Sequence, residues 1–149
     1  DRGKIVCEPN YRLPAAIHPI SSTAIYGRSL YEAEEDMNTL EQALVKQLTA
    51  IPNVLWWHRN IARHGFAING YFNHYPDIMI MTKSGKIILA ETKGEHLKND
   101  DSQEKIELGA AWRNAAGNQY RYYMVFQNEE NLPHGAVSMG QFVETVKAL

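Results

Sequence analysis

Residues 75–94 decide the fold of this 149-residue chain; from Tyr75 to Gly94 they read YPDIMIMTKSGKIILAETKG. The two apolar runs, IMIM and IILA, suit strands that are buried on both faces. Between the runs, Lys83-Ser84-Gly85 is typical of a three-residue hairpin loop, with Gly85 at the position that needs a positive φ. The stretch therefore predicts an antiparallel hairpin.

The length of this loop fixes which residues face one another. If Thr82 and Lys86 close the loop, counting outward places Asp77 opposite Glu91, and Glu91 shares a face with Lys93 two residues on. A two-residue loop would instead turn Asp77 to the other face. The three-residue loop therefore predicts two carboxylates and an ammonium at one end of a hydrophobic hairpin.

These three charges point to a metal-dependent site. Two neighbouring carboxylates repel each other unless a cation lies between them. Oxygen ligands from few side chains, with room for water and phosphate, suit Mg²⁺. A lysine beside them could activate water or stabilise the charge that builds on a phosphate. The alternative is a salt-bridged strand end, with Glu91 and Lys93 merely solvated; the upstream Pro76-Asp77 favours a site.

The pair Pro76-Asp77 followed by Glu91-Thr92-Lys93 resembles the PD-(D/E)XK nuclease motif. From about Leu30 to about Phe126 the wider sequence resembles the C-terminal endonuclease domain of the restriction (Res) subunit of type III restriction enzymes. The strings that carry this resemblance are WWHRN (56–60), NHYPD (73–77), KSGK (83–86), ETKG (91–94) and YRYYMVF (120–126).

The resemblance implies an α/β chain with a PD-(D/E)XK restriction-endonuclease-like fold. Its central mixed four-stranded sheet would have an αβββαβ core flanked by helices, plus a C-terminal helix. It implies a Mg²⁺-dependent endodeoxyribonuclease, with Mn²⁺ able to substitute, in which Asp77 and Glu91 hold the metal. The backbone carbonyl of Thr92 would be a further metal ligand, and Lys93 would orient or activate water.

The implied partners are double-stranded DNA, an ATP-driven translocase (helicase) part of the same parent chain, and a separate modification methyltransferase subunit. This chain has no glycine-rich loop that could cradle phosphates, so ATP would be bound by the parent enzyme only. Two alternatives stay open: a stand-alone repair or junction nuclease, and a non-catalytic module of the same fold for DNA contact or docking. The hydrolytic set Asp77, Glu91 and Lys93 favours the nuclease.

Periodicity predicts the other elements. In chain order they are a helix from about Leu30 to Thr49, a strand at 54–59, a short hairpin around Asn69-Gly70, the main hairpin, a helix ending near Ala116, a strand at 120–126 and a helix at 138–148. Gly117 would close the second helix, although Gly109 weakens its interior. We expect the 120–126 strand to return beside the first strand through the crossover helix.

The first predicted helix carries two acids on its apolar face, beside Met37 and Leu44. A carboxylate on such a face costs free energy unless it is paired or binds a cation. The first core helix of the nuclease family often supplies an acid to the metal site, so Glu41 is the first candidate and Glu34 the second. The alternative for Glu41 is a capping partner of Asn38.

The charge balance argues against a chain that grips DNA strongly alone. The formal net charge is -2, whereas phosphate contacts dominate DNA affinity and favour basic proteins. Residues 51–70 nevertheless contain no acid. The candidate DNA contacts are Arg59, Arg63, His74, Lys98 and Lys105. A solvated surface is the alternative for the basic stretch, and a structural hydrogen bond is favoured for His74.

The length fits one domain, residues 30–149, preceded by an irregular arm or linker over 1–29 that three prolines punctuate. The opening Asp1-Arg2-Gly3-Lys4 is typical of a piece of a longer polypeptide. The single Cys7 and the lack of a signal peptide predict a reducing compartment, the cytoplasm. No apolar run approaches the roughly 20 residues of a transmembrane helix, so we expect no membrane partner. Zinc-ligand spacing is also missing.

Overall fold

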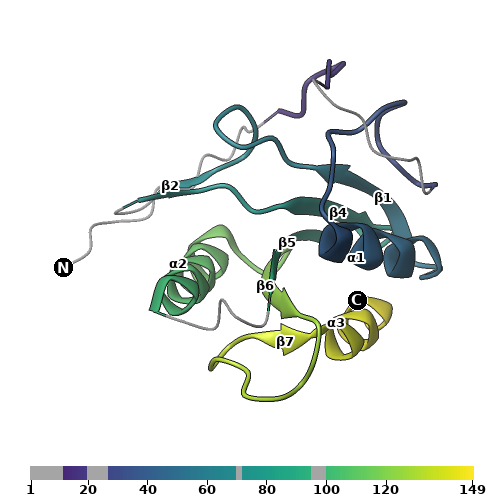
Figure 1. The fold of residues 1–149 in the computed structure, drawn as a ribbon. Coiled ribbons are helices and arrows are strands. Elements are labelled where there is room, and N and C mark those ends of the chain that lie inside the picture. The colour runs from purple at the N-terminus through teal and green to yellow at the C-terminus, as the bar shows by residue number, and fades with distance from the viewer. Residues whose placement is uncertain (1–11, 20–26, 70–71, 95–99) are drawn as a thin grey trace.

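The computed structural model describes residues 12–19, 27–69, 72–94 and 100–149. Within these ranges the chain is a mixed α/β structure with a five-stranded sheet, a separate two-stranded sheet and three helices (Figure 1). The elements are α1 (Thr39–Thr49), β1 (Val54–Arg59), β2 (Ile68–Asn69), β3 (Asn73–His74), β4 (Ile78–Thr82), β5 (Ile87–Lys93), α2 (Asp100–Ala116), β6 (Tyr120–Phe126), β7 (Val137–Ser138) and α3 (Met139–Lys147).

The main hairpin forms as the sequence predicts. The amide of Thr82 donates to the carbonyl of Lys86 across 2.9 Å, and Gly85 has a φ of 87°. Ile78 pairs with Ala90, so the three-residue loop and its register are confirmed. The same count, continued by one residue, sets Asp77 opposite Glu91.

The sheet order is β1-β4-β5-β6-β7, which corrects two expectations. The sheet has five strands rather than four, because the short β7 pairs in parallel with β6. The strand at 120–126 does not lie beside the first strand: β6 pairs in parallel with β5. Its crossover through α2 returns it next to the strand it left, which is the usual neighbour in space.

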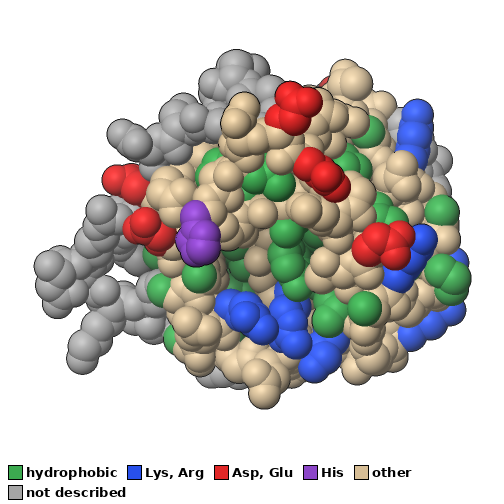
Figure 2. Space-filling view, turned by 90° about the horizontal axis from the view of Figure 1, so that it is seen from below, with side chains coloured by type: hydrophobic (Ala, Val, Ile, Leu, Met, Phe, Trp, Pro, Cys, Tyr) green, Lys and Arg blue, Asp and Glu red, His purple; other side chains and the backbone are tan. Residues whose placement is uncertain are grey.

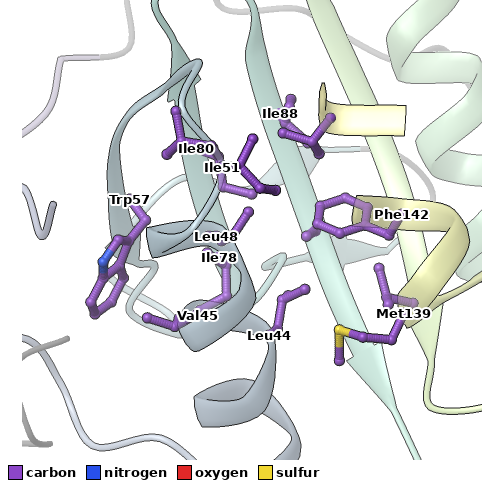
Figure 3. Packing of buried hydrophobic residues seen from close by; sticks show 14 of the residues in the cluster. Leu44, Val45, Leu48, Ile51, Trp57, Ile78, Ile80, Ile88, Met139 and Phe142 are labelled. Atoms are coloured by element: carbon purple, nitrogen blue, oxygen red, sulfur yellow. The ribbon is translucent and has the colours of Figure 1, made fainter. Parts of the chain in front are cut away.

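Two helical layers cover the sheet, with α1 and α3 on one face and α2 on the other (Figure 1). Side chains along β4 alternate between these layers, as strand geometry requires. Ile78 and Ile80 pack with the α1 and α3 side, where Figure 3 shows them near Leu48. Met79 packs on the α2 side. Both faces of the hairpin are therefore core, which explains its continuous apolar runs.

Helix α2 packs closely against β6 at Gly109. A Cβ built on Gly109 would meet the ring of Tyr122 at 2.2 Å. The glycine lowers helix propensity by about 1 kcal/mol relative to alanine, but a larger residue here would push the helix off the sheet. Gly109, which weakened the helix prediction, thus allows α2 to pack against the ring of Tyr122.

The ends of the helices follow their capping residues. Helix α1 begins at Thr39, not near Leu30 as expected, because Asn38 and Glu41 form a reciprocal capping box. The segment before Asn38 is not helical. Gly117, with a φ of 106°, closes α2 as predicted. The predicted C-terminal helix is also confirmed, as α3, and Ser138 caps it.

The remaining expectations concern short segments. The extra hairpin is confirmed as β2 and β3, although Gly70 lies outside the described residues. The described part of the N-terminal arm contacts the domain: Leu13 packs on the α2 side and the Tyr31 hydroxyl donates to the Pro14 carbonyl. In the described part of the chain, no helix combines the length and apolar composition that crossing a bilayer requires.

Candidate active site

An open cleft of about 640 Å³ lies at the charged end of the main hairpin. Four parts of the chain line it: the start of α1, the end of β1, the residue before β4 and the end of β5, with α2 closing one side. The charged lining residues are Glu41, Arg59, Asp77, Glu91, Lys93 and Lys105. The cleft thus brings together the three predicted catalytic residues, the first-choice acid of α1 and two of the predicted DNA contacts.

Asp77 is held in one orientation by the opposite strand. Its Oδ2 accepts hydrogen bonds from the amide and the hydroxyl of Thr92, at 2.9 and 3.1 Å. Its Oδ1 lies 3.9 Å from Nη1 of Arg59. One oxygen is therefore fixed by the sheet, and the other faces a cation.

Glu41 divides its two oxygens between the helix cap and the cleft. Oε1 accepts from the amide of Asn38 at 2.9 Å, and Oε2 lies 3.3 Å from Nη2 of Arg59. Burial and then Asp77 raise the pKa of Glu41, against the opposing effect of Arg59. The capping role predicted as the alternative is confirmed, and it coexists with a place in the cleft.

The surroundings of Glu91 disfavour its charged form. Its side chain is buried, and two basic side chains approach its Oε2: Nε2 of His74 at 3.7 Å and Nζ of Lys105 at 3.8 Å. Both distances exceed hydrogen-bonding range. Burial and then Asp77 raise the pKa of Glu91 well above its usual range, although Lys93 and Lys105 oppose this. Glu91 therefore favours a proton or a cation.

His74 and Tyr122 form the wall behind Glu91. Nε2 of His74 lies 2.8 Å from the Tyr122 hydroxyl, and the two rings meet edge to face. Burial, followed by Lys105, lowers the pKa of His74 to about 4. The imidazole is thus neutral near pH 7, and its 3.7 Å approach to Glu91 is not an ion pair. His74 thus makes a side-chain hydrogen bond, which is the kind of role that the sequence favours for it over a phosphate contact.

The two lysines lie at one side of the cleft and share Asp101. Nζ of Lys93 is 3.9 Å from Oδ2 of Asp101, and Nζ of Lys105 is 3.4 Å from the same oxygen. Burial lowers the pKa of Lys105, but Glu91, Lys93 and Asp101 together outweigh burial and raise it. Lys105 consequently stays charged in its place beside Glu91.

Other candidates from the sequence lie elsewhere. Glu34 is not on a helix and is not in the cleft, which corrects its proposed metal role: Oε2 accepts from Arg59 N and contacts Nδ1 of His58 at 2.9 Å. Arg63 is exposed in the loop after β1. Lys98 lies outside the described residues. On the face shown in Figure 2, Lys and Arg side chains lie side by side below the centre, and the acidic side chains that are visible lie mostly above them.

The cleft offers carboxylate oxygens that could bind a divalent cation. Among the described residues, no group of three or more His, Cys, Asp or Glu side chains is arranged to hold a metal ion. Mg²⁺, however, is usually bound through one or two carboxylates together with waters and substrate phosphates. Asp77 and Glu91 offer such oxygens in an open cleft, so the donor chemistry fits Mg²⁺.

Two residues near the site, Asp101 and Tyr122, were not among those that the sequence predicts for it. The i, i+4 spacing of Asp101 and Lys105 on α2 was a usable signal for an ion pair. Tyr122 had no such signal. It lies near Glu91 through its hydrogen bond to His74, and its place on β6 follows from the parallel pairing of Leu89 with Tyr122, a register that no turn fixes.

The comparisons with known proteins add little. No protein-family model matches the chain, and no curated protein matches it. Among solved structures, it is similar to the crystal structure of protein VC1899 from Vibrio cholerae, with 16% identity and a TM-score of 0.37. The match covers 71% of this chain and 30% of that chain. A likeness this low carries no argument about fold or function.

Proposed function

We propose that this chain is a Mg²⁺-dependent endodeoxyribonuclease domain that hydrolyses DNA phosphodiester bonds. The observation that carries the proposal is the cleft itself. Asp77 and Glu91 lie opposite each other across the hairpin, and Lys93 follows two residues after Glu91 on the same strand. Glu41 joins them from α1. Metal-assisted hydrolysis of a phosphodiester uses such oxygen ligands for the ion, and a lysine beside them can stabilise the charge that builds on the phosphate.

We assign the fold to the PD-(D/E)XK restriction-endonuclease-like class. The supporting feature is the order of elements: α1, the three antiparallel strands β1, β4 and β5, the crossover helix α2, and then β6. The β2–β3 hairpin is an insertion in this order, and β7 with α3 follows it. The motif residues lie at the open end of the central hairpin, where both strands leave the core.

The residues divide the chemistry among themselves. Asp77 and Glu91 would hold Mg²⁺, with Glu41 and the backbone carbonyl of Thr92 as further oxygen donors. When bound, the ion supplies the positive charge that offsets the phosphate and makes water a better nucleophile. Thr92 holds Asp77 in place through two hydrogen bonds, so this carboxylate needs little reorganisation when the substrate arrives.

The lysines act on the substrate side. Lys93 would orient the attacking water or stabilise the charge that develops on the phosphate. Lys105, which is charged and beside Glu91, would bind a phosphate oxygen from α2. His74, which is buried, lies behind Glu91 and is hydrogen-bonded to the partly buried Tyr122, so these two side chains would keep bulk water away from that carboxylate.

We place the domain as the cleavage module of an ATP-dependent type III restriction enzyme, on the resemblance of its sequence strings. The translocase part of the parent chain and a modification methyltransferase subunit would then bring it to DNA. One hydrolytic site cuts one strand at a time, so a double-strand break needs two copies on opposite strands. Tethering to the parent enzyme would raise the local DNA concentration.

The test is cleavage of supercoiled plasmid by the purified chain, in excess, with Mg²⁺ or Mn²⁺ and with EDTA. We expect slow nicking with either metal and none in EDTA. The Asp77→Asn chain should no longer nick the plasmid. The Glu144→Gln chain, in which a carboxylate is likewise replaced by an amide but at an exposed position of α3, should still nick it. Nicking by Asp77→Asn at the wild-type rate would refute the site assignment.

One observation favours a second function, a non-catalytic module for DNA contact or docking. Arg59, Lys93 and Lys105 already bring three positive charges to the three carboxylates of the cleft. A charge network satisfied in this way needs no metal. The melting temperature separates the two: a catalytic site should be stabilised by Mg²⁺ or Mn²⁺ in the wild-type chain and not in Asp77→Ala.

A further inference from the structure

The positive charges of the cleft fall into two groups that differ in position. Lys93 and Lys105 lie beside Glu91, where they share Asp101. Arg59 lies on the other side of Asp77, at the end of β1. The lysines therefore serve the substrate side of the cleft, and Arg59 needs a separate explanation.

Arg59 sits between two carboxylates that a cation would otherwise bridge. Its Nη2 is 3.3 Å from Oε2 of Glu41, and its Nη1 is 3.9 Å from Oδ1 of Asp77. The side chain is 19% exposed, so water screens these contacts only in part. The pKa of Glu41 is raised by burial and by Asp77, and Arg59 opposes this rise. Arg59 is thus the counter-charge of the Glu41–Asp77 pair.

The guanidinium is placed there by the backbone and not by chance. Its Nη1 donates to the carbonyls of Asn60 and Asp77, at 2.6 and 3.1 Å. The Arg59 amide donates to the buried Glu34, and the Asn60 amide donates to the Asp77 carbonyl at 2.8 Å. These bonds fix both the start and the tip of the side chain.

The guanidinium is nevertheless not fully satisfied. Nε of Arg59 is buried and finds no hydrogen-bond partner among the residues that the structure describes. A buried donor without an acceptor costs free energy, so the contacts of Arg59 with the two carboxylates must outweigh the loss of one hydrogen bond at Nε. An arginine placed for structure alone would be expected to satisfy this donor.

We propose that Arg59 stands in for a divalent cation between Glu41 and Asp77 when no metal is bound, and that it thereby sets the metal affinity of the cleft. The inference rests on the proposed function and gives Arg59 a role other than the DNA contact that the sequence predicts for it. A guanidinium stays charged at any physiological pH, so it cannot yield its place by losing a proton. An incoming metal ion must therefore compete with a fixed positive charge.

The test measures metal binding and not cleavage. Mn²⁺ is titrated into the full chain, and its apparent Kd is followed by calorimetry and by the rise in melting temperature. Arg59→Gln should bind Mn²⁺ about tenfold more tightly than the wild type, because a unit charge a few ångströms from the ion is removed. Arg113→Gln, which removes the same charge from an exposed position of α2, should leave the Kd unchanged.

A further variant and a stability measurement keep the inference testable if Arg59→Gln folds poorly. Arg59→Lys keeps the charge but not the planar fork, so its Kd should lie between those of the wild type and Arg59→Gln. In EDTA, Arg59→Gln should melt below the wild type, and Mn²⁺ should raise its melting temperature by more. If Arg59→Gln is too unstable to purify, Arg59→Lys alone must still bind Mn²⁺ more tightly than the wild type.

The outcomes separate this inference from the proposed function. An Arg59→Gln chain that is folded and binds Mn²⁺ no more tightly than the wild type overturns the role of Arg59. Loss of Mn²⁺ binding in Asp77→Asn alongside that result would leave the proposed metal site standing. If Asp77→Asn keeps the wild-type Kd, the metal lies elsewhere, and both ideas fail.

Discussion

Two buried glutamates, Glu34 and Glu91, show how the same residue serves structure in one place and chemistry in another. They are 1% and 5% exposed. Glu34 accepts from Ser29 Oγ at 3.1 Å and from the Arg59 amide at 3.1 Å, and it contacts His58 at 2.9 Å. It is a fully engaged carboxylate under the edge of the sheet.

Glu91 has a similar burial and an opposite environment. Its basic neighbours are 3.7 and 3.8 Å away, and a second carboxylate, Asp77, lies near enough to raise its pKa further. A buried carboxylate left this way costs stability, and proteins keep such groups where function requires them. The burial of an acid therefore says little about its role until the hydrogen-bond donors to its oxygens are known.

The largest expected effect concerns cleavage. Asp77→Ala, Glu91→Ala and Lys93→Ala should each lower the cleavage rate of the full enzyme by at least about 10³-fold. The three residues act as one catalytic unit, so the loss of any one of them removes most of the activity. Glu34→Gln should keep cleavage by its folded fraction, since Glu34 touches no lining carboxylate. The rates are measured on plasmid DNA, with circular dichroism to check folding. Full cleavage by Glu91→Ala would remove the distinction between the two glutamates.

The next effect concerns stability without metal. Glu34→Ala should lower the free energy of unfolding by about 3 kcal/mol, because it leaves His58 and the Arg59 amide without their buried acceptor. Glu91→Gln should be neutral or should stabilise by up to about 1 kcal/mol, because it removes repulsion from Asp77. Urea unfolding in EDTA measures both. A large loss in Glu91→Gln would favour a structural salt bridge instead.

The pH dependence of stability should expose the wall behind Glu91. The folded chain holds His74 neutral down to a pKa of about 4, whereas the unfolded chain takes up this proton near pH 6.5. Stability from His74 is therefore complete above pH 6.5 and is lost as the pH falls toward 4. The difference corresponds to about 3 kcal/mol of unfolding free energy.

Glu41 and Glu91 act in the opposite direction over part of this range. Their raised pKa values mean that the folded chain binds protons more tightly above about pH 4.5, so their contribution falls as the pH rises. In His74→Gln only this second trend remains, and stability should increase on moderate acidification below pH 6.5. Urea midpoints between pH 4.5 and 7 test it; parallel profiles for variant and wild type would contradict a neutral His74.

The smallest expected effect concerns DNA binding. With a net charge of -2, the chain should bind duplex DNA non-specifically with a Kd on the order of 10⁻⁴–10⁻⁶ M at physiological salt. Lys105→Gln should reduce the salt dependence by about one phosphate contact, and Arg63→Gln, outside the cleft, should change it less. Labelled duplexes of differing sequence at two salt concentrations provide the measurement. Tight, sequence-selective binding at high salt would indicate a self-sufficient nuclease.

Local rules made part of this molecule predictable. The position of Gly85 sets the loop length, the loop sets the register, and the register brings Asp77 opposite Glu91. Gly117 set the end of α2 in the same way. Because each of these steps involves residues close in sequence, a single chain is enough to work them out.

Long-range relations were not predictable in this way. The apolar period of α1 continues back through Met37, so the capping box at Asn38 was hidden and Glu34 was assigned to a helix. The neighbour of β6 is set by contacts between parts of the chain that are far apart in sequence, as in the pairing of Ile87 with Tyr120. Contacts across such distances leave no periodic trace in the sequence.

The pairing of Ser29 with Trp57 has a consequence for how the domain behaves in solution. The Leu30 amide donates to the Trp57 carbonyl and the Trp57 amide to the Arg28 carbonyl, so this segment shields part of the outer edge of β1. An uncovered edge strand is a template on which further chains can pair and aggregate. A shortened chain beginning at Tyr31 would keep every residue of the cleft and still expose that edge, with self-association as the expected result.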